Sequence, residues 1–152
     1  MSVSPEILEK ARHYCAYQER CQQEVRKKLY TLGLGRQDVE LLIASLITEN
    51  FINEERFSRA FARGKFRIKR WGKIRINLEL KQRNISPYCI RKAMEEIPDD
   101  EYQEALDAWI LKKAGTSGRS GPAVNKRIAD FVIGKGFEPA LVWKAVRNIL
   151  NT

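Results

Sequence analysis

Nine basic residues lie between Arg63 and Arg83, against a single acid, Glu79. Phosphate groups bind cations most readily where no carboxylate already neutralises them, and arginine adds a planar guanidinium that can bind phosphate through two hydrogen bonds. This window therefore predicts a surface that binds a polyanion such as DNA. If six of these cations touched phosphates, the affinity would fall about a thousandfold or more between ~50 and ~200 mM salt. The candidate binding residues are Arg63, Lys65, Arg67, Lys69, Arg70, Trp71, Lys73, Arg75, Lys81 and Arg83.

Two alternatives stay open for this window. The cations are also compatible with a solvated helix face on which lysine and arginine stems cover apolar surface. Trp71, which precedes Gly72, is either an exposed indole at the tip of a basic loop or an indole that folds back and seals the junction between two helices. Trp109 and Trp143, in contrast, lie on apolar helical faces and are predicted to belong to the core.

The positive charge is concentrated in the middle third of the chain. The sequence of 152 residues has a formal net charge of +9, with 28 lysine and arginine residues and 19 aspartate and glutamate residues. Residues 51–98 hold thirteen of the basic residues and five of the acidic ones, a net charge of +8. Residues 1–50 are neutral, and residues 99–152 carry +1. A surplus confined to one segment indicates a partner with an acidic surface, whereas a uniform surplus would indicate only solubility.

The sequence contains no pattern typical of catalysis or of a cofactor site. It has neither a G-x-x-x-x-G-K-[ST] phosphate loop nor a G-x-G-x-x-G motif at the start of a helix. His13, the single histidine, has no partnered serine or cysteine with which to form a triad. The adjacent carboxylates at 54–55, 95–96 and 99–100 are expected at helix termini rather than in an acid–base or two-metal site. We therefore expect a protein that is not an enzyme and has no cofactor.

The three cysteines, Cys15, Cys21 and Cys89, are an odd number without C-x-x-C spacing. Structural zinc usually takes four Cys or His ligands in close pairs, so no metal site is expected, and the thiols are predicted to be reduced and partly buried. The segment Met1–Glu6 lacks the basic-then-apolar layout of a secretory signal, and no apolar run approaches the ~18 residues that span a bilayer. We therefore expect a cytoplasmic protein without membrane contact.

An apolar pattern that recurs about every fifty residues predicts the elements that hold these cations. Each copy has apolar residues at helical spacing, then a turn residue, then a second apolar helical set. The turn residues are Gly33, Asn84 and Gly136, residue types that tolerate positive φ after a helix. The three sets are Val25, Leu29, Leu34, Val39, Ile43 and Leu46; Ile76, Leu80, Ile85, Ile90, Met94 and Ile97; and Ile128, Val132, Phe137, Val142, Val146 and Ile149.

A further helix is predicted before each pair, so each unit is expected to contain three helices. Ser4, Asn53 and Asp99 precede or begin these leading helices, where polar caps and acids suit the positive end of the helix dipole. Since one unit buries little apolar surface alone, neighbouring units are expected to stack. The predicted fold class is all-α, with three tandem three-helix repeats at 1–50, 51–98 and 99–152.

Two parts of the sequence depart from simple helical spacing. Between Ile74 and Leu80, apolar and polar residues alternate, which alone would favour a strand, but the register of the repeat favours a helix. The glycine- and serine-rich segment 115–122 is predicted to be irregular, as is the shorter segment 69–73 at the corresponding place of the middle unit.

Two stretches of the middle unit resemble the signature of the RecX family. They are Phe51–Phe61 (FINEERFSRAF) and Lys69–Ile85 (KRWGKIRINLELKQRNI). The family pattern has an aromatic–aliphatic pair, an acidic cap, two aromatics four residues apart, a basic loop with glycine, and I-x-x-E-L followed by a turn before isoleucine. The flanking units are similar to the family's tandem layout. The sequence departs from the pattern at Asn53, where the family usually has aspartate, and at Asn84, where it has glycine; asparagine suits both positions.

The resemblance implies three tandem three-helix repeats in an elongated, curved array without right-angled turns. It also implies a regulator of homologous recombination and of the SOS response. Such a regulator lodges in the helical groove of the RecA filament on DNA and restrains its extension, ATPase, strand exchange and co-protease activity. The partners that it implies are the RecA filament and single- and double-stranded DNA, bound without sequence specificity. We expect a monomer.

A helix-turn-helix transcriptional regulator is the alternative from another functional class. The short turns between paired helices are compatible with it. A sequence-specific binder, however, needs a defined recognition helix and usually paired half-sites, and a threefold repeat singles out no such helix. A third alternative is a helical scaffold that binds only proteins, with an association that depends little on salt.

Overall fold

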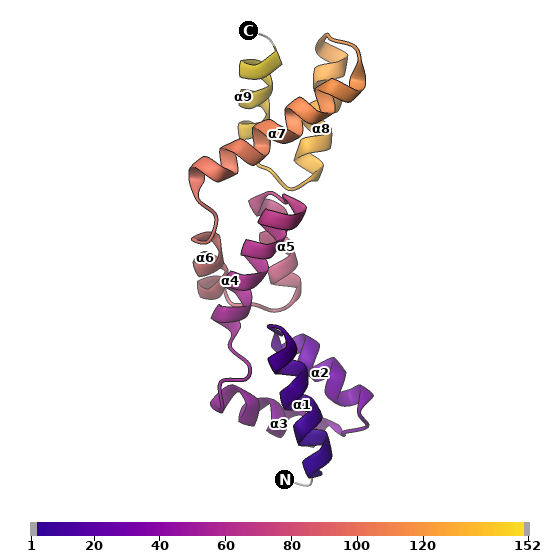
Figure 1. Cartoon of the computed structure of the whole chain (residues 1–152), viewed down its shortest axis with the longest axis vertical. Coiled ribbons are helices and arrows are strands. Elements are labelled where there is room, and N and C mark those ends of the chain that lie inside the picture. Colours follow the sequence, from indigo (N-terminus) through magenta and orange to yellow (C-terminus); the bar gives the residue numbers. More distant parts are fainter. Residues whose placement is uncertain (1–2, 151–152) are drawn as a thin grey trace.

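All regular structure in the computed structural model, which describes residues 3–150, is helical. The helices stack into an elongated molecule whose two ends carry the two termini (Figure 1). No strand occurs in that range, and the prediction of an all-α helical repeat is confirmed. The elements are α1 (Pro5–Tyr17), α2 (Gln22–Thr31), α3 (Arg36–Thr48), α4 (Glu54–Gly64), the π-helix η1 (Lys65–Lys69), α5 (Lys73–Gln82), α6 (Pro87–Met94), α7 (Asp99–Ser117), α8 (Pro122–Gly134) and α9 (Pro139–Leu150).

The three predicted turn residues all adopt positive φ, at 93° for Gly33, 59° for Asn84 and 103° for Gly136. The apolar positions that define the three copies are buried or half-buried without exception. These turns therefore use residue types that enter the left-handed region at little cost, and they let each pair of helices close over its own apolar face.

The segment in which apolar and polar residues alternate, Ile74–Leu80, folds as part of the helix α5. Ile76 and Leu80, four residues apart, are completely buried, whereas Ile74 and Leu78 are 48% and 52% exposed. A helix places residues i and i+4 on the same face, so only one of the two apolar pairs reaches the core. The prediction of a helix is confirmed.

Side-chain caps fix several of the predicted helix starts. The Oγ of Ser4 accepts a hydrogen bond from an amide of the first turn of α1 at 3.2 Å, and Asn53 Oδ1 accepts one from Arg56 N at 2.9 Å. Ser86 Oγ does the same for α6 at 3.2 Å. Each cap satisfies an amide that has no partner within its helix.

The buried residues form two apolar cores rather than three. One core lies within α1–α3 and ends at Ile52. The other runs without interruption from α4 to α9, and it also takes in Cys21 from the start of α2. The second and third units thus share a core, while the first unit has its own. The limits 1–50, 51–98 and 99–152 stay predictions, and residues 1, 2, 151 and 152 lie outside the described range.

A backbone contact joins the second and third units. Gly72 N donates to Lys135 O and Ile74 N donates to Gly136 O, both at 2.9 Å. A Cβ at Gly72 would lie 2.2 Å from the carbonyl carbon of Gly136, so only glycine allows this approach. The buried Tyr102 completes the joint, because its hydroxyl accepts from Lys73 N at 2.9 Å and donates to Glu138.

The first and second units meet at a more polar seam. Arg56 of α4 donates to Glu19 at 2.6 Å, and its guanidinium also donates to the carbonyl oxygen of Asn50 at 3.0 Å. A hollow of about 360 Å³ lies beside this pair and is lined by Gln18, Glu19 and Glu24 from the first unit and by Phe57, Ala60, Phe61, Lys65 and Arg83 from the second. Within residues 3–150, no backbone hydrogen bond joins α1–α3 to the helices α4–α9, in contrast to the other joint.

Two predicted irregular segments are shorter than expected. Residues 115–117 continue α7, so the irregular part of 115–122 is confined to 118–121, where Gly118 and Gly121 have positive φ. In the middle unit η1 extends helical structure to Lys69 and leaves only residues 70–72 between helices. In both places the preceding helix continues further than the glycine-rich or basic composition indicated.

Candidate nucleic-acid interface

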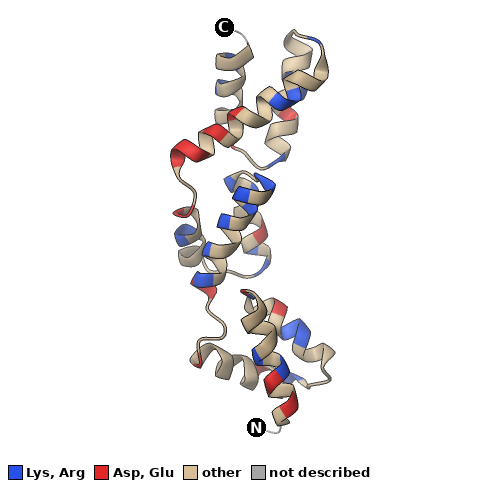
Figure 2. Cartoon of the chain, in the orientation of Figure 1, with Lys and Arg blue, Asp and Glu red and all other residues tan. Residues whose placement is uncertain are grey.

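The basic window lies on three connected elements: the end of α4, η1 and α5. Arg70 ends η1 in the left-handed conformation, with φ of 56°, and the next amide, that of Trp71, donates to Lys65 O at 3.3 Å. Gly72 then begins α5 as its N-cap. Figure 2 shows lysine and arginine gathered along these elements in the middle of the molecule, whereas acids gather in the first half of α7.

Two aromatic rings form the centre of this region. Phe61 and Trp71 pack edge to face, with ring centroids 6.4 Å apart. Three cations surround them: Arg75 lies 4.0 Å from the Trp71 ring, Lys65 lies 5.1 Å from it, and Arg83 lies 4.9 Å from the Phe61 ring. Cation–π attraction thus joins residues that are up to 22 positions apart in the sequence, Phe61 and Arg83.

Trp71 folds back rather than projecting from a loop tip. Its indole is half-buried and packs against the shared core of the second and third units. The junction-sealing interpretation therefore describes this residue. Trp109 and Trp143 also pack against that core but are only half-buried, so their predicted core position is confirmed in part.

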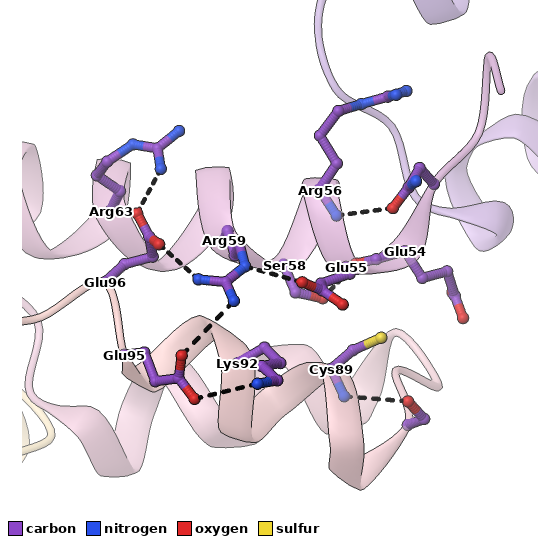
Figure 3. Close-up of polar contacts among 12 residues, drawn as sticks. Glu54, Glu55, Arg56, Ser58, Arg59, Arg63, Cys89, Lys92, Glu95 and Glu96 are labelled. Atoms are coloured by element: carbon purple, nitrogen blue, oxygen red, sulfur yellow. Dashed lines mark hydrogen bonds and ion pairs between the residues drawn. The ribbon is translucent and has the colours of Figure 1, made fainter.

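Three of the candidate cations are paired with carboxylates. Arg63 contacts Glu96 at 2.6 Å, Lys73 contacts Asp99 at 3.8 Å, and Arg83 contacts Glu79 at 3.2 Å. The first pair belongs to a network in which Arg59 also binds Glu96, at 2.7 Å (Figure 3). Hydrogen bonds from Arg63 and Arg59 lower the pKa of Glu96, which stays ionised at neutral pH.

Four other candidates are exposed and form no ion pair within residues 3–150. They are Arg67, Lys69, Arg70 and Lys81. Lys65 and Arg75 also lack an ion pair in this range, and their charged groups lie over the rings. Lys65 and Arg83 border the seam hollow together with Glu19 and Glu24, so acids of the first unit lie near them. The nine candidate cations thus divide into exposed, ring-bound and paired groups, and the tenth candidate, Trp71, is one of the rings that they surround.

Cations outside the sequence window also gather around aromatic rings. Lys112 and Lys135 lie 5.5 and 4.8 Å from the ring of Trp109, and Trp109 Nε1 donates to the carbonyl oxygen of Arg70 at 2.9 Å. Sequence reasoning missed these residues because they belong to the third unit, which is nearly neutral. The only local signal is a lysine three residues after a tryptophan, which places both on neighbouring turns of a helix.

Outside this region, the described residues show a hollow beside α1 but no group of metal-binding side chains. A hollow of about 680 Å³ borders α1 and is lined by Glu6, Glu9, Lys10, His13, Tyr14, Tyr17, Arg20 and Lys28. Within residues 3–150 no three Cys, His, Asp or Glu residues are grouped to hold a metal ion. Cys15, Cys21 and Cys89 are free thiols, the first two buried, as predicted. No helix in this range is long and apolar enough to cross a membrane.

Comparisons with known proteins agree with this architecture. Residues 53–94 match the family model described as "RecX, second three-helix domain". The regulatory protein RecX of Herminiimonas arsenicoxydans is 30% identical over 139 residues, which cover 91% of this chain and 89% of that protein. The regulatory protein RecX of Prosthecochloris aestuarii is 24% identical over 99% of this chain and 97% of its own. The crystal structure of RecX from Lactobacillus salivarius matches with a TM-score of 0.82 and 22% identity, over 95% of this chain and 94% of that one. This chain belongs to the RecX family of regulatory proteins.

Proposed function

We propose that this protein regulates homologous recombination and the SOS response by binding the RecA–DNA filament. In this proposal it restrains filament extension, ATP hydrolysis and strand exchange without performing chemistry itself. The observation that supports it most directly is the set of exposed cations without carboxylate partners, Arg67, Lys69, Arg70 and Lys81, on a unit of net charge +8. Such cations bind phosphates because no local carboxylate must first be displaced.

The elongated shape supports the same proposal. Groups of helices follow one another along an elongated body (Figure 1). In this proposal, that body contacts more than one protomer of the filament. The shared core of the second and third units keeps the middle unit's cations at fixed positions relative to α7–α9. Inhibition then results from clamping neighbouring protomers and DNA in one arrangement.

The test is RecA ATPase activity on single-stranded DNA, titrated with this protein at two ionic strengths. The test variant carries Arg67→Ala, Lys69→Ala and Lys81→Ala. Each lost phosphate contact should reduce the salt dependence of binding by about 0.7 in log–log slope, so the triple variant should reduce the slope by about 2. It should also inhibit the ATPase less at equal concentration.

The matched control carries Lys27→Ala, Arg36→Ala and Lys144→Ala, which remove the same charge from exposed positions on α2, α3 and α9. It should inhibit like the unmodified protein. Equal inhibition by the test variant and the unmodified protein would refute the role of these cations. No inhibition by the unmodified protein would refute the proposed function, and a sequence-specific footprint on naked duplex would favour the helix-turn-helix regulator instead.

A further inference from the structure

A second site is built where the second and third units meet, around the indole of Trp109. Lys112 of α7 and Lys135 at the end of α8 place their ammonium groups 5.5 and 4.8 Å from the centre of this ring. Neither lysine forms an ion pair within residues 3–150, and Lys112 is exposed. Lys135 is half-buried, and Arg70, from the loop before α5, adds a third cation that is exposed. The site therefore draws on three separate segments of the chain.

Contacts at its edges hold the indole in one orientation. Its Nε1 donates to Arg70 O at 2.9 Å, and its ring packs edge to face on Phe131, with centroids 5.8 Å apart and planes inclined by 70°. The same hydrogen bond supports Arg70 in the left-handed conformation, with φ of 56°, which is uncommon for a residue other than glycine or asparagine. An aromatic ring fixed in this way loses little freedom when a ligand binds to it.

A hollow of about 190 Å³ lies against this indole. It is lined by Arg70, Ala105, Ala108, Trp109 and Lys112. The two alanines have no side chain beyond Cβ, so they leave open the side of the hollow that a longer residue on α7 would fill. The lining thus combines an aromatic ring, small apolar groups and two cations at the rim.

We propose that this hollow binds one nucleotide of single-stranded DNA. The base stacks against Trp109 and the two small residues, while Arg70, Lys112 and Lys135 contact the adjoining phosphates. An aromatic platform bordered by cations recognises any base, because every base has a π face and every nucleotide carries a phosphate. This inference rests on the proposed function in that the ligand is the DNA of the filament, and it extends the interface from the middle unit to the third.

Photochemical cross-linking tests the site on the intact chain. The probe is an oligothymidylate with one 5-iododeoxyuridine, which cross-links to an aromatic side chain stacked on it. Cleavage after lysine and arginine places the three tryptophans in different peptides, residues 71–73, 93–112 and 136–144. The cross-link is expected in residues 93–112, at Trp109.

Affinity for the same oligonucleotide without iodine provides a second measurement. Trp109→Ala should lower it roughly 5- to 100-fold, as loss of one base–aromatic stack does. Trp109→Phe, which keeps a ring but not the Nε1 donor, should lower it less. Lys112→Ala should reduce the salt slope by about 0.7, whereas Lys144→Ala, an exposed lysine on α9, should leave it unchanged.

The outcomes separate this inference from the proposed function. Cross-linking confined to residues 71–73 would refute the Trp109 site and leave DNA binding by the middle unit in place. Binding of DNA without any cross-link in residues 93–112 would refute it equally. Weaker binding of RecA by Trp109→Ala, with unchanged affinity for DNA, would identify a protein ligand and overturn the nucleotide. If the unmodified protein binds neither DNA nor the filament, both proposals fail.

Discussion

Replacement of Gly72 by alanine would create a steric clash at the joint between the second and third units. The new Cβ would lie 2.2 Å from the Gly136 carbonyl carbon and 2.3 Å from the Phe137 amide nitrogen, where an ordinary contact is 3.4–4 Å. Both partners are backbone atoms, so no change of rotamer relieves the overlap. The joint must open by about 1 Å or more, which breaks the hydrogen bonds that Lys135 O and Gly136 O accept there.

The expected loss of stability follows from these contacts. Overpacking of a close-packed region costs about 1–3 kcal/mol, and each of the two lost hydrogen bonds costs about 0.5–1.5 kcal/mol. Together they amount to about 2–6 kcal/mol of unfolding free energy. For a chain of this size, each kcal/mol shifts the midpoint of thermal unfolding by about 2–4 °C. The Gly72→Ala variant should therefore unfold roughly 5–20 °C below the unmodified protein.

Thermal unfolding followed by circular dichroism measures this shift, and Gly64→Ala is the matched control. Gly64 lies in a helical conformation, with φ of −68°, and a Cβ there meets nothing within 4 Å. Alanine at that position should stabilise the protein by about 0.5–1 kcal/mol, because the unfolded chain loses freedom. Equal midpoints for Gly72→Ala and the unmodified protein would show that the two units do not depend on this contact.

Three more predictions concern individual side chains. Tyr102→Phe should lower the unfolding free energy by about 1–3 kcal/mol in denaturant titrations, because an amide of α5 loses its buried partner. The hydrogen bonds from Arg63 and Arg59 lower the pKa of Glu96 in the folded protein, so ionised Glu96 stabilises the fold at any pH above its pKa in the unfolded chain. This stabilisation is lost as the pH falls through the lower pKa of the folded protein. Melting temperatures between pH 7 and 3 should therefore fall less steeply for Glu96→Gln than for Glu95→Gln. Burial raises the pKa of Cys21 to about 11, so a thiol reagent at pH 8 should modify Cys89 first; equal rates would contradict the buried position of Cys21.

The repeat could be predicted because it depends on residue type alone. Each position of the pattern needs only to be apolar, and the turns need only Gly or Asn, so Gly33, Asn84 and Gly136 identified the helix pairs without knowledge of their neighbours. The helical state of α5 followed in the same way, since the register of the other two copies outweighed its local alternation.

Contacts between units could not be predicted from the sequence. Gly72 and Gly136 are 64 residues apart, and neither composition nor spacing indicates that their backbones touch. The same holds for the pairing of Lys73 with Asp99, which takes a cation out of the predicted surface. Arg70 at positive φ also carries no sequence signal, because glycine or asparagine is the usual residue there.

Two cores along one elongated chain give the molecule unequal resistance to bending. The part from α4 to α9 should resist bending, because bending there would disrupt a continuous apolar core and a joint of touching backbones. The end piece formed by α1–α3 contacts this part through Cys21 and through the Arg56–Glu19 ion pair beside a hollow, so bending should occur first at this seam. If this protein is bound to a helical filament whose pitch changes, α1–α3 should therefore be reoriented while the part from α4 to α9 keeps its shape.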